Sequence, residues 1–214
     1  MDIFWLGQSA FRLKTKTATI IIDPFSPEIG LPWTKQPADI LLMSHEHPDH
    51  HHQDGVEAGF TAEGPGEYEV KEVTIAGTRL YHDAVKGAER GPITAFSLVA
   101  ENMTICHLSD LGHELQAEQV EALTGADVLM IPVGGVYTID GAAAAKVISQ
   151  LEPRIVIPMH YKIPGLSEQL PLESLDVFMK ALGKEQGESL TSLRITKDTL
   201  PDEMRVVVLE PKRD

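Results

Sequence analysis

The sequence predicts an α/β protein in which β-sheets are packed between helices, and two observations carry this prediction. Short apolar segments separated by turns open the chain at residues 3–6, 10–13 and 18–22, which is typical of a β-meander. Later segments alternate between helical and strand-like patterns, beginning with a helix over 115–123 and a buried strand over 128–133. Strands first and alternating helices and strands afterwards indicate sheets with helices outside them.

The other expected elements follow the same two patterns. Between the meander and the first helix we expect only strands, at residues 39–43, 68–70, 73–75, 78–81, 94–99 and 104–108, with Gly-rich acidic turns near 63–67. After it we expect helices at 141–151 and 172–182, and strands at 154–159, 192–195 and 205–209. The chain has no internal repeat and no clear linker, so we expect residues 1–214 to form a single domain.

Charge and cysteine content limit the classes of function. With 32 acidic and 18 basic residues the net charge is −14, which would repel a phosphate backbone, so we expect no nucleic-acid partner. Cys106 is the only cysteine, which excludes an internal disulfide and disfavours a thiolate metal site. Neither a signal peptide nor an apolar run of about 20 residues is present. We therefore expect a cytoplasmic protein with a small-molecule substrate and no membrane association; nothing in the sequence indicates its oligomeric state.

A histidine-rich loop follows the predicted strand at 39–43. Its pattern is His45-x-His47-x-Asp49-His50, and imidazole and carboxylate are good ligands for zinc and similar ions. At a strand end, residues two apart project to the same side, so His45 and His47 can reach one ion. Pro48 turns the chain, so Asp49 and His50 can face a second position. The loop cannot complete two such sites alone, because a catalytic zinc usually takes three protein ligands.

Three further candidate ligands come at the ends of later predicted strands: His82, Asp110 and His160. The two oxygens of a carboxylate allow Asp110 to bridge two ions. The predicted arrangement places one ion on His45, His47 and His82, and a second ion on Asp49, His50 and His160, with Asp110 between them.

These motifs resemble those of the metallo-β-lactamase superfamily of metal-dependent hydrolases over nearly the whole chain. The matching pieces are residues 4–11 (FWLGQSAF), 21–25 (IIDPF), 45–50 (HEHPDH), His82-Asp83, 108–112 (LSDLG) and 158–161 (PMHY). They look most like the small, lactonase-like cytosolic branch. The resemblance implies a four-layer αββα sandwich with a dinuclear site at one edge of the two sheets. One departure is Ser109, where the family usually has glycine before the bridging aspartate; Asp110 is retained, and the local turn is what the change puts in question.

The function that we expect is hydrolysis by a metal-bound hydroxide, and the resemblance favours an ester, lactone or phosphoester bond in a small metabolite. Two divalent ions are expected, zinc in the first place and manganese or iron as alternatives. Asp49 would orient the water and relay a proton. Three alternatives remain: a nuclease, disfavoured by the acidic charge and the lack of an added domain; a di-iron oxidoreductase, disfavoured by His47; and a non-catalytic metal-dependent binding or regulatory protein.

Two other histidines lie near the motifs. Strand alternation would put His107 and Asp110 on opposite faces, so we expect His107 to be a hydrogen-bonded core histidine rather than a ligand. His113 could line the substrate pocket, or it could have a role at a helix start or on the surface.

The remaining polar positions are expected to support the site or to lie outside it. Asp23 is expected to act behind the ligands or in a turn, and Tyr161 to be packed. His51 and His52 fall outside the motif. The loops at 24–37 and 83–92 are expected to wall the substrate pocket.

Overall fold

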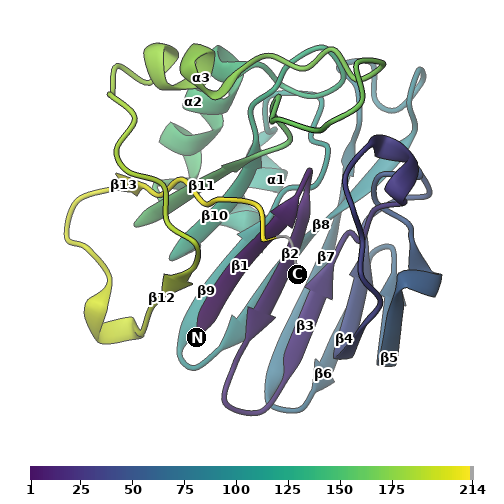
Figure 1. Ribbon diagram of the computed structural model, residues 1–214. Coiled ribbons are helices and arrows are strands. Elements are labelled where there is room, and N and C mark those ends of the chain that lie inside the picture. The colour runs from purple at the N-terminus through teal and green to yellow at the C-terminus, as the bar shows by residue number, and fades with distance from the viewer. Residues whose placement is uncertain (213–214) are drawn as a thin grey trace.

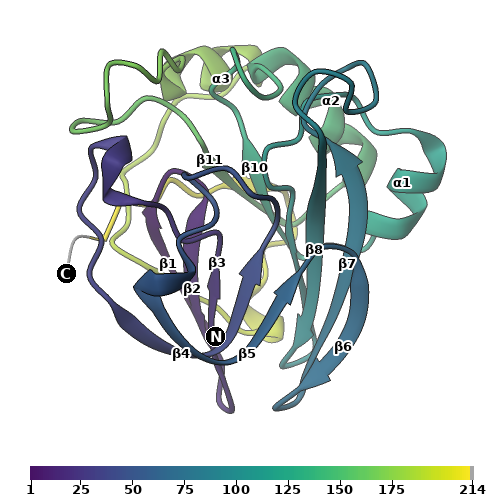
Figure 2. The same ribbon diagram turned by 90° about the vertical axis from the view of Figure 1, so that its right-hand side faces the viewer.

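Two β-sheets lie face to face in the structure, a computed structural model that describes residues 1–212 (Figures 1 and 2). The first sheet has the strand order β12-β1-β2-β3-β4-β5. Its strands are β1 (Asp2–Gly7), β2 (Ala10–Lys14), β3 (Thr19–Ile22), β4 (Gln36–Met43), β5 (Val56–Glu63) and β12 (Leu193–Arg194). The second sheet has the order β13-β11-β10-β9-β8-β7-β6. Its strands are β6 (Gly66–Val70), β7 (Val73–Tyr81), β8 (Pro92–Ala100), β9 (Met103–His107), β10 (Val128–Pro132), β11 (Ile155–Met159) and β13 (Arg205–Val206).

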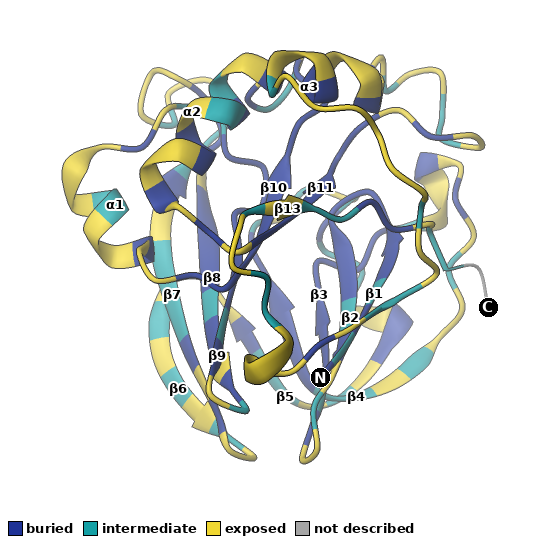
Figure 3. Cartoon of the chain, turned by 90° about the vertical axis from the view of Figure 1, so that its left-hand side faces the viewer, coloured by how far each residue is buried: buried dark blue, intermediate teal, exposed yellow. Residues whose placement is uncertain are grey.

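The helices lie outside the sheets, with their exposed faces turned to solvent (Figure 3). They are α1 (Ala117–Leu123), α2 (Gly141–Leu151) and α3 (Leu175–Ala181), with short 3-10 segments η1 (Pro27–Ile29), η2 (Gln53–Gly55) and η3 (Lys197–Thr199). Asp140 caps α2 by accepting a hydrogen bond from the Ala143 amide at 2.8 Å. Within residues 1–212, no helix combines the length and apolar character needed to span a membrane. The predicted α/β architecture, with sheets between helices, is confirmed.

Strands β3 and β4 are apolar on both faces, which explains their continuous runs of isoleucine and leucine. Ile20, Ile22 and Leu42 belong to the large core between the sheets. Ile21 and Leu41 point the other way, into a smaller cluster against which Trp33 packs. The outer face of the first sheet is therefore covered by the loop that carries Trp33.

Strand directions bring many strand ends to one edge of the molecule. Strand β1 runs antiparallel to β2 and β2 antiparallel to β3, while β3 and β4 are parallel, so β1, β3 and β4 share one direction. In the second sheet β9, β10 and β11 are parallel, and β7 has the direction of β9 because both are antiparallel to β8. Carboxyl ends of strands are the usual place for a site in α/β folds. Two backbone hydrogen bonds join the sheets at this edge, from Thr94 N to Ser44 O at 3.0 Å and from His160 N to Gln8 O at 3.1 Å.

Three of the differences from the predicted elements have a clear local cause. Strand β5 was not expected, because Val56–Glu63 is a half-exposed edge strand with weak apolar alternation. The segments predicted at 73–75 and 78–81 form one strand, β7, which continues through Gly77. The helix predicted over 172–182 starts later, with Ser174 at its N-cap, because Pro171 and the polar residues after Leu172 belong to the preceding loop.

Candidate metal centre

The histidine loop begins directly after β4, at the edge where the strand ends meet. His45 Nε2 and His47 Nδ1 lie 3.1 Å apart. His82 follows β7 in the second sheet, and one ligand atom from each of these three histidines lies within 4.8 Å of the others. These residues form the first ligand group, and it draws on both sheets.

A second ligand group lies beside the first and consists of Asp49, His50, Asp110 and His160, whose ligand atoms are also within 4.8 Å of one another. Asp110 Oδ2 is 3.1 Å from His50 Nε2 and 3.3 Å from His160 Nε2. The same oxygen is 3.4 Å from Nε2 of His82, which belongs to the first group. Asp110 therefore lies between the two groups. The structure brings all seven predicted ligands together; their role as ligands stays a prediction.

Asp23 lies behind both groups and determines which ring nitrogens carry hydrogen. Its Oδ2 contacts His50 Nδ1 at 2.9 Å and accepts a hydrogen bond from Ser44 Oγ at 2.7 Å. An ionised carboxylate only accepts, so His50 carries its hydrogen on Nδ1. Ser44 has given its own hydrogen to Asp23, so the 2.9 Å contact between Ser44 Oγ and His45 Nδ1 needs a hydrogen on that nitrogen too. In both histidines Nε2 is left with its lone pair for an ion.

Burial and neighbouring charges shift the pKa values of the cluster. Burial lowers the pKa of His45 to about 3, so this imidazole is neutral. Burial alone would raise the pKa of Asp110, but the charges on His160 and His50 hold it well below its usual range. In return, Asp110 outweighs the effect of burial on His160 and raises its pKa to about 9.

These pKa shifts indicate that the cluster favours the binding of positive charge. Without an ion, protons on His50 and His160 neutralise the two carboxylates. Within residues 1–212, the buried Nε2 of His50 has no partner in hydrogen-bond geometry, although Asp110 Oδ2 lies 3.1 Å away. Imidazole and carboxylate groups at this spacing fit divalent cations, whose binding would displace the protons.

The backbone at the site adopts conformations that residues other than glycine seldom take. Gln8, Asp23, Ser109 and His160 have φ angles of 51°, 48°, 51° and 52°, and each comes just after a strand. Such left-handed residues cost free energy and tend to occur at functional sites. At Ser109 the turn therefore keeps the conformation that glycine adopts most readily. The serine adds a hydroxyl, whose Oγ donates to Ser44 Oγ at 2.6 Å.

The sequence analysis missed three polar residues at the centre, Gln8, Ser9 and Ser44. Gln8 Nε2 donates to Asp49 Oδ2 at 2.9 Å, and Ser9 Oγ donates to Asp110 Oδ1 at 3.3 Å. Residues 7–9 look like a simple turn in the sequence. They could have been found from their position directly after β1, which runs in the same direction as β4 and so ends at the same edge.

The other polar residues take structural roles. His107 is fully buried, and its Nε2 lies 2.8 Å from Ser9 O, which confirms a core histidine; strand alternation is not the reason, because β9 ends at His107. His113 accepts a hydrogen bond from Tyr81 N at 3.2 Å, a role at the end of β7 that was not among those predicted for it. Tyr161 packs on Trp5 with ring centroids 5.1 Å apart.

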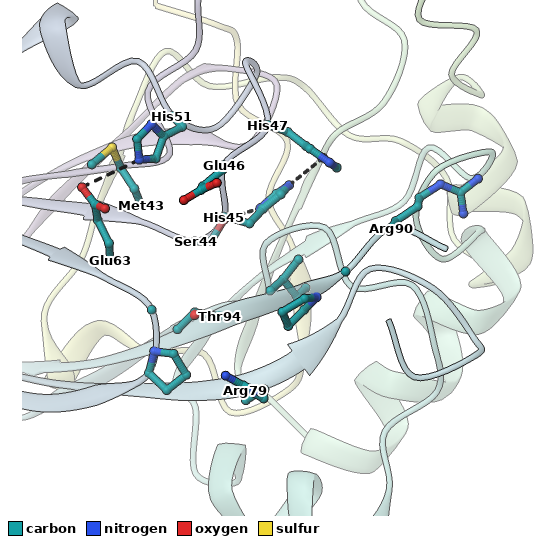
Figure 4. A pocket seen from close by; sticks show the side chains of 15 residues that line it. Met43, Ser44, His45, Glu46, His47, His51, Glu63, Arg79, Arg90 and Thr94 are labelled. Atoms are coloured by element: carbon teal, nitrogen blue, oxygen red, sulfur yellow. Dashed lines mark hydrogen bonds and ion pairs between the residues drawn. The ribbon is translucent and has the colours of Figure 1, made fainter. Parts of the chain in front are cut away.

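A cavity of about 620 Å³ opens beside His45 and His47 (Figure 4). The loop at 83–92 contributes to its wall, as predicted, through Arg90, Gly91 and Pro92. The loop at 24–37 was expected to do the same, and this is wrong: none of its residues lines this cavity within residues 1–212. That loop instead covers the outer face of the first sheet through Trp33.

Comparison with known proteins gives a family for this combination of fold and site. Residues 2–160 match the family described as the beta-lactamase superfamily domain. A Zn-dependent hydrolase of the metallo-β-lactamase superfamily from Thermotoga maritima has a similar structure, with a TM-score of 0.79, 35% identity and 97% coverage of both chains. A UPF0173 metal-dependent hydrolase from Methanopyrus kandleri is 28% identical over 88% of this chain and 99% of its own. The archaeal metallo-hydrolase Igni18 from Ignicoccus hospitalis, at 20% identity and a TM-score of 0.66 over 99% of this chain and 96% of that one, shares the fold.

The chain therefore belongs to the metallo-β-lactamase superfamily. Its class within the superfamily is that of the metal-dependent hydrolases, and the expected αββα fold is confirmed.

Proposed function

We propose that this protein hydrolyses an ester, lactone or phosphoester bond in a small metabolite with the help of two divalent ions. His45, His47 and His82 would hold one ion, and Asp49, His50 and His160 the other, with Asp110 shared. Zinc suits this set best, and manganese or iron would also be accepted. The supporting observation is the position of Asp110 Oδ2, which lies 3.1 Å from His50 in one group and 3.4 Å from His82 in the other.

The bound ions would supply a hydroxide nucleophile at neutral pH and would polarise the carbonyl or phosphoryl oxygen of the substrate. Asp49 and Asp110 would have different roles, because their side chains differ in exposure. The side chain of Asp49 is 16% exposed and that of Asp110 is 2% exposed. Because it is partly exposed, Asp49 can accept a hydrogen bond from water and pass a proton to the leaving group, whereas the buried Asp110 would only hold the ions.

Gln8 supports this role of Asp49. Its Nε2 donates to Asp49 Oδ2 at 2.9 Å and so fixes the orientation of the carboxylate. The backbone of Gln8 is itself fixed, because its carbonyl accepts hydrogen bonds from Trp5 Nε1 at 2.9 Å and His160 N at 3.1 Å.

The test is to measure metal content and turnover in His47→Ala and Asp110→Ala. We expect His47→Ala to retain at most one ion per chain, and Asp110→Ala to weaken both sites and abolish turnover. His52→Ala is the matched control, because His52 lies in the same loop but packs near Trp33 with a centroid distance of 6.3 Å. Full metal loading and full activity in either variant would refute the two-ion scheme. The cytoplasmic location and the single domain stay predictions from the sequence.

A further inference from the structure

We propose that the cavity beside His45 and His47 binds the oxyanion group of its substrate, a carboxylate or a phosphate, through the guanidinium of Arg79. The proposal rests on the hydrolase function above and adds the class of substrate. It would make the preferred substrate a small anion whose charged group lies away from the bond that is cleaved.

Strand geometry places Arg79 on the inner face of β7. Phe96 and His107 are directly paired across β8 and β9, and His107 packs edge-on against Phe11 of the first sheet at 5.8 Å. This face of the second sheet therefore looks toward the first sheet. Thr94 is two residues from Phe96, so it faces the same way, and Arg79 is its direct partner on β7.

A backbone hydrogen bond connects the residue paired with Arg79 to the residue that precedes His45. The amide of Thr94 donates to Ser44 O at 3.0 Å, and Ser44 directly precedes His45. The side chain of Arg79 thus starts one strand away from the point where the sheets are joined. Figure 4 shows Arg79 and Thr94 on one wall of the cavity and His45, Glu46 and His47 on the other.

The guanidinium of Arg79 is available for a ligand. Arg79 is exposed, and within residues 1–212 its side chain has no hydrogen-bond or ion-pair partner. Glu63, an acidic residue that also lines the cavity, lies 3.7 Å from His51 Nε2. The second arginine of the cavity wall, Arg90, has its guanidinium 5.8 Å above the ring of Tyr137.

The chemistry of the cavity favours an oxyanion with a short apolar spacer. Guanidinium is the side chain best suited to carboxylate and phosphate oxygens. The cavity lining also includes the apolar residues Met43, Pro92 and Ile93, and its volume of about 620 Å³ suits a small metabolite. Because the chain carries a net charge of −14, an acidic substrate needs such a local positive charge to be held.

The experiment compares three aryl esters of equal acyl length that end in a methyl group, a carboxylate or a phosphate. We expect Arg79→Gln to raise KM about tenfold for one or both anionic esters, with kcat nearly unchanged and the methyl ester unaffected. Arg79→Lys should recover part of the loss. Arg205→Gln, which removes an exposed arginine on β13 at the opposite edge of the sheet, is the matched control. The two anionic esters show whether carboxylate or phosphate is preferred.

A binding measurement separates this inference from the proposed function. Glutarate and inorganic phosphate are titrated into metal-loaded and metal-free protein by calorimetry, and the Nε–H signal of Arg79 is followed by NMR. Binding that Arg79→Gln weakens would support the inference even if no ester were cleaved, in which case only the proposed function would fail. Equal KM changes for charged and neutral esters, or anion binding unaffected by Arg79→Gln, would overturn it.

Discussion

Ser109 donates a 2.6 Å hydrogen bond from its Oγ to the Oγ of Ser44. Ser44 in turn donates to Asp23 at 2.7 Å and lies 2.9 Å from His45 Nδ1. The serine that stands in place of the usual glycine therefore extends the hydrogen-bond network behind the first ligand group. It does so from a left-handed conformation, with φ of 51°.

Replacement of this serine should separate metal affinity from folding stability. In Ser109→Gly the supporting hydroxyl is lost, so we expect metal affinity to fall about tenfold. Glycine also relieves the cost of the positive φ, so the metal-free protein should be as stable as the wild type or more stable. Chelator competition and thermal unfolding of the metal-free protein measure the two effects. Ser109→Ala should lose both affinity and stability. Wild-type affinity in both variants would show that the hydroxyl does not support the site.

Asp23→Asn should weaken both ligand groups at once. Asp23 is fully buried and accepts from Ser44 N at 2.8 Å as well as from the Ser44 hydroxyl and His50. An amide of the same shape brings N–H donors to a place where acceptors are needed, which should cost about 1–3 kcal/mol of stability. Denaturant unfolding of the metal-free protein and metal analysis by mass spectrometry would check this. Asp39→Asn, which affects a half-exposed carboxylate of the same sheet, should retain its metal.

Asp83 holds the loop at 83–92 through its carboxylate, and its contribution should depend on pH. Oδ1 accepts from Val85 N at 2.9 Å and Gly87 N at 2.8 Å, and Oδ2 from Glu89 N at 3.0 Å and Arg90 N at 2.8 Å. Burial opposes ionisation, but these amides lower the pKa of Asp83 to about 2 from its ordinary value of 3.8. Because the folded-state pKa is depressed, the stabilisation is present above about pH 4 and is lost as the pH falls toward 2.

The corresponding measurement is the difference in melting temperature between wild type and Asp83→Asn as a function of pH. We expect a constant advantage for the wild type above about pH 5 that shrinks as the solution becomes more acidic. At neutral pH the four loop amides should also exchange faster in the variant. Asp202→Asn, at an exposed position, should show neither effect.

The thiol of Cys106 should be inert in the folded protein. It is fully buried, and burial raises its pKa to about 12 from 9.0. A thiol-specific reagent at pH 8 should therefore react only after denaturant is added. The raised pKa also means that Cys106 favours folding below about pH 9 and that this preference fades as the pH rises toward 12. Rapid stoichiometric labelling of the native protein would contradict this burial.

Much of the fold was readable from local patterns because the central strands are apolar on both faces. Residues 39–43 and 128–133 were predicted in this way. The first range lies within β4, and the second covers β10 and one residue beyond it. Edge elements carry a weaker signal, because solvent on one side removes the need for apolar residues. This is why β5 was missed. Strand β7, next to the edge strand β6, was divided because its half-buried middle around Gly77 interrupts the apolar pattern.

The candidate ligands could be predicted for a related reason. Histidine and aspartate directly after an apolar strand are conspicuous in any sequence, as at His82 and His160. Gln8, Ser9 and Ser44 are common loop residues. Only the three-dimensional arrangement shows that Gln8 reaches Asp49, that Ser9 reaches Asp110 and that Ser44 reaches Asp23. The arrangement of Arg79 beside Thr94 likewise depends on strand register, which no local pattern reveals.

Each ligand group takes residues from both sheets, with His45 and His47 opposite His82, and Asp49 and His50 opposite Asp110 and His160. An ion bound to either group would act as a cross-link between the two halves of the sandwich. Its retention would then depend on the sheets staying together rather than on the integrity of any single strand. During unfolding, the metal should accordingly be released when the two sheets begin to separate. This release should precede the loss of secondary structure seen by circular dichroism.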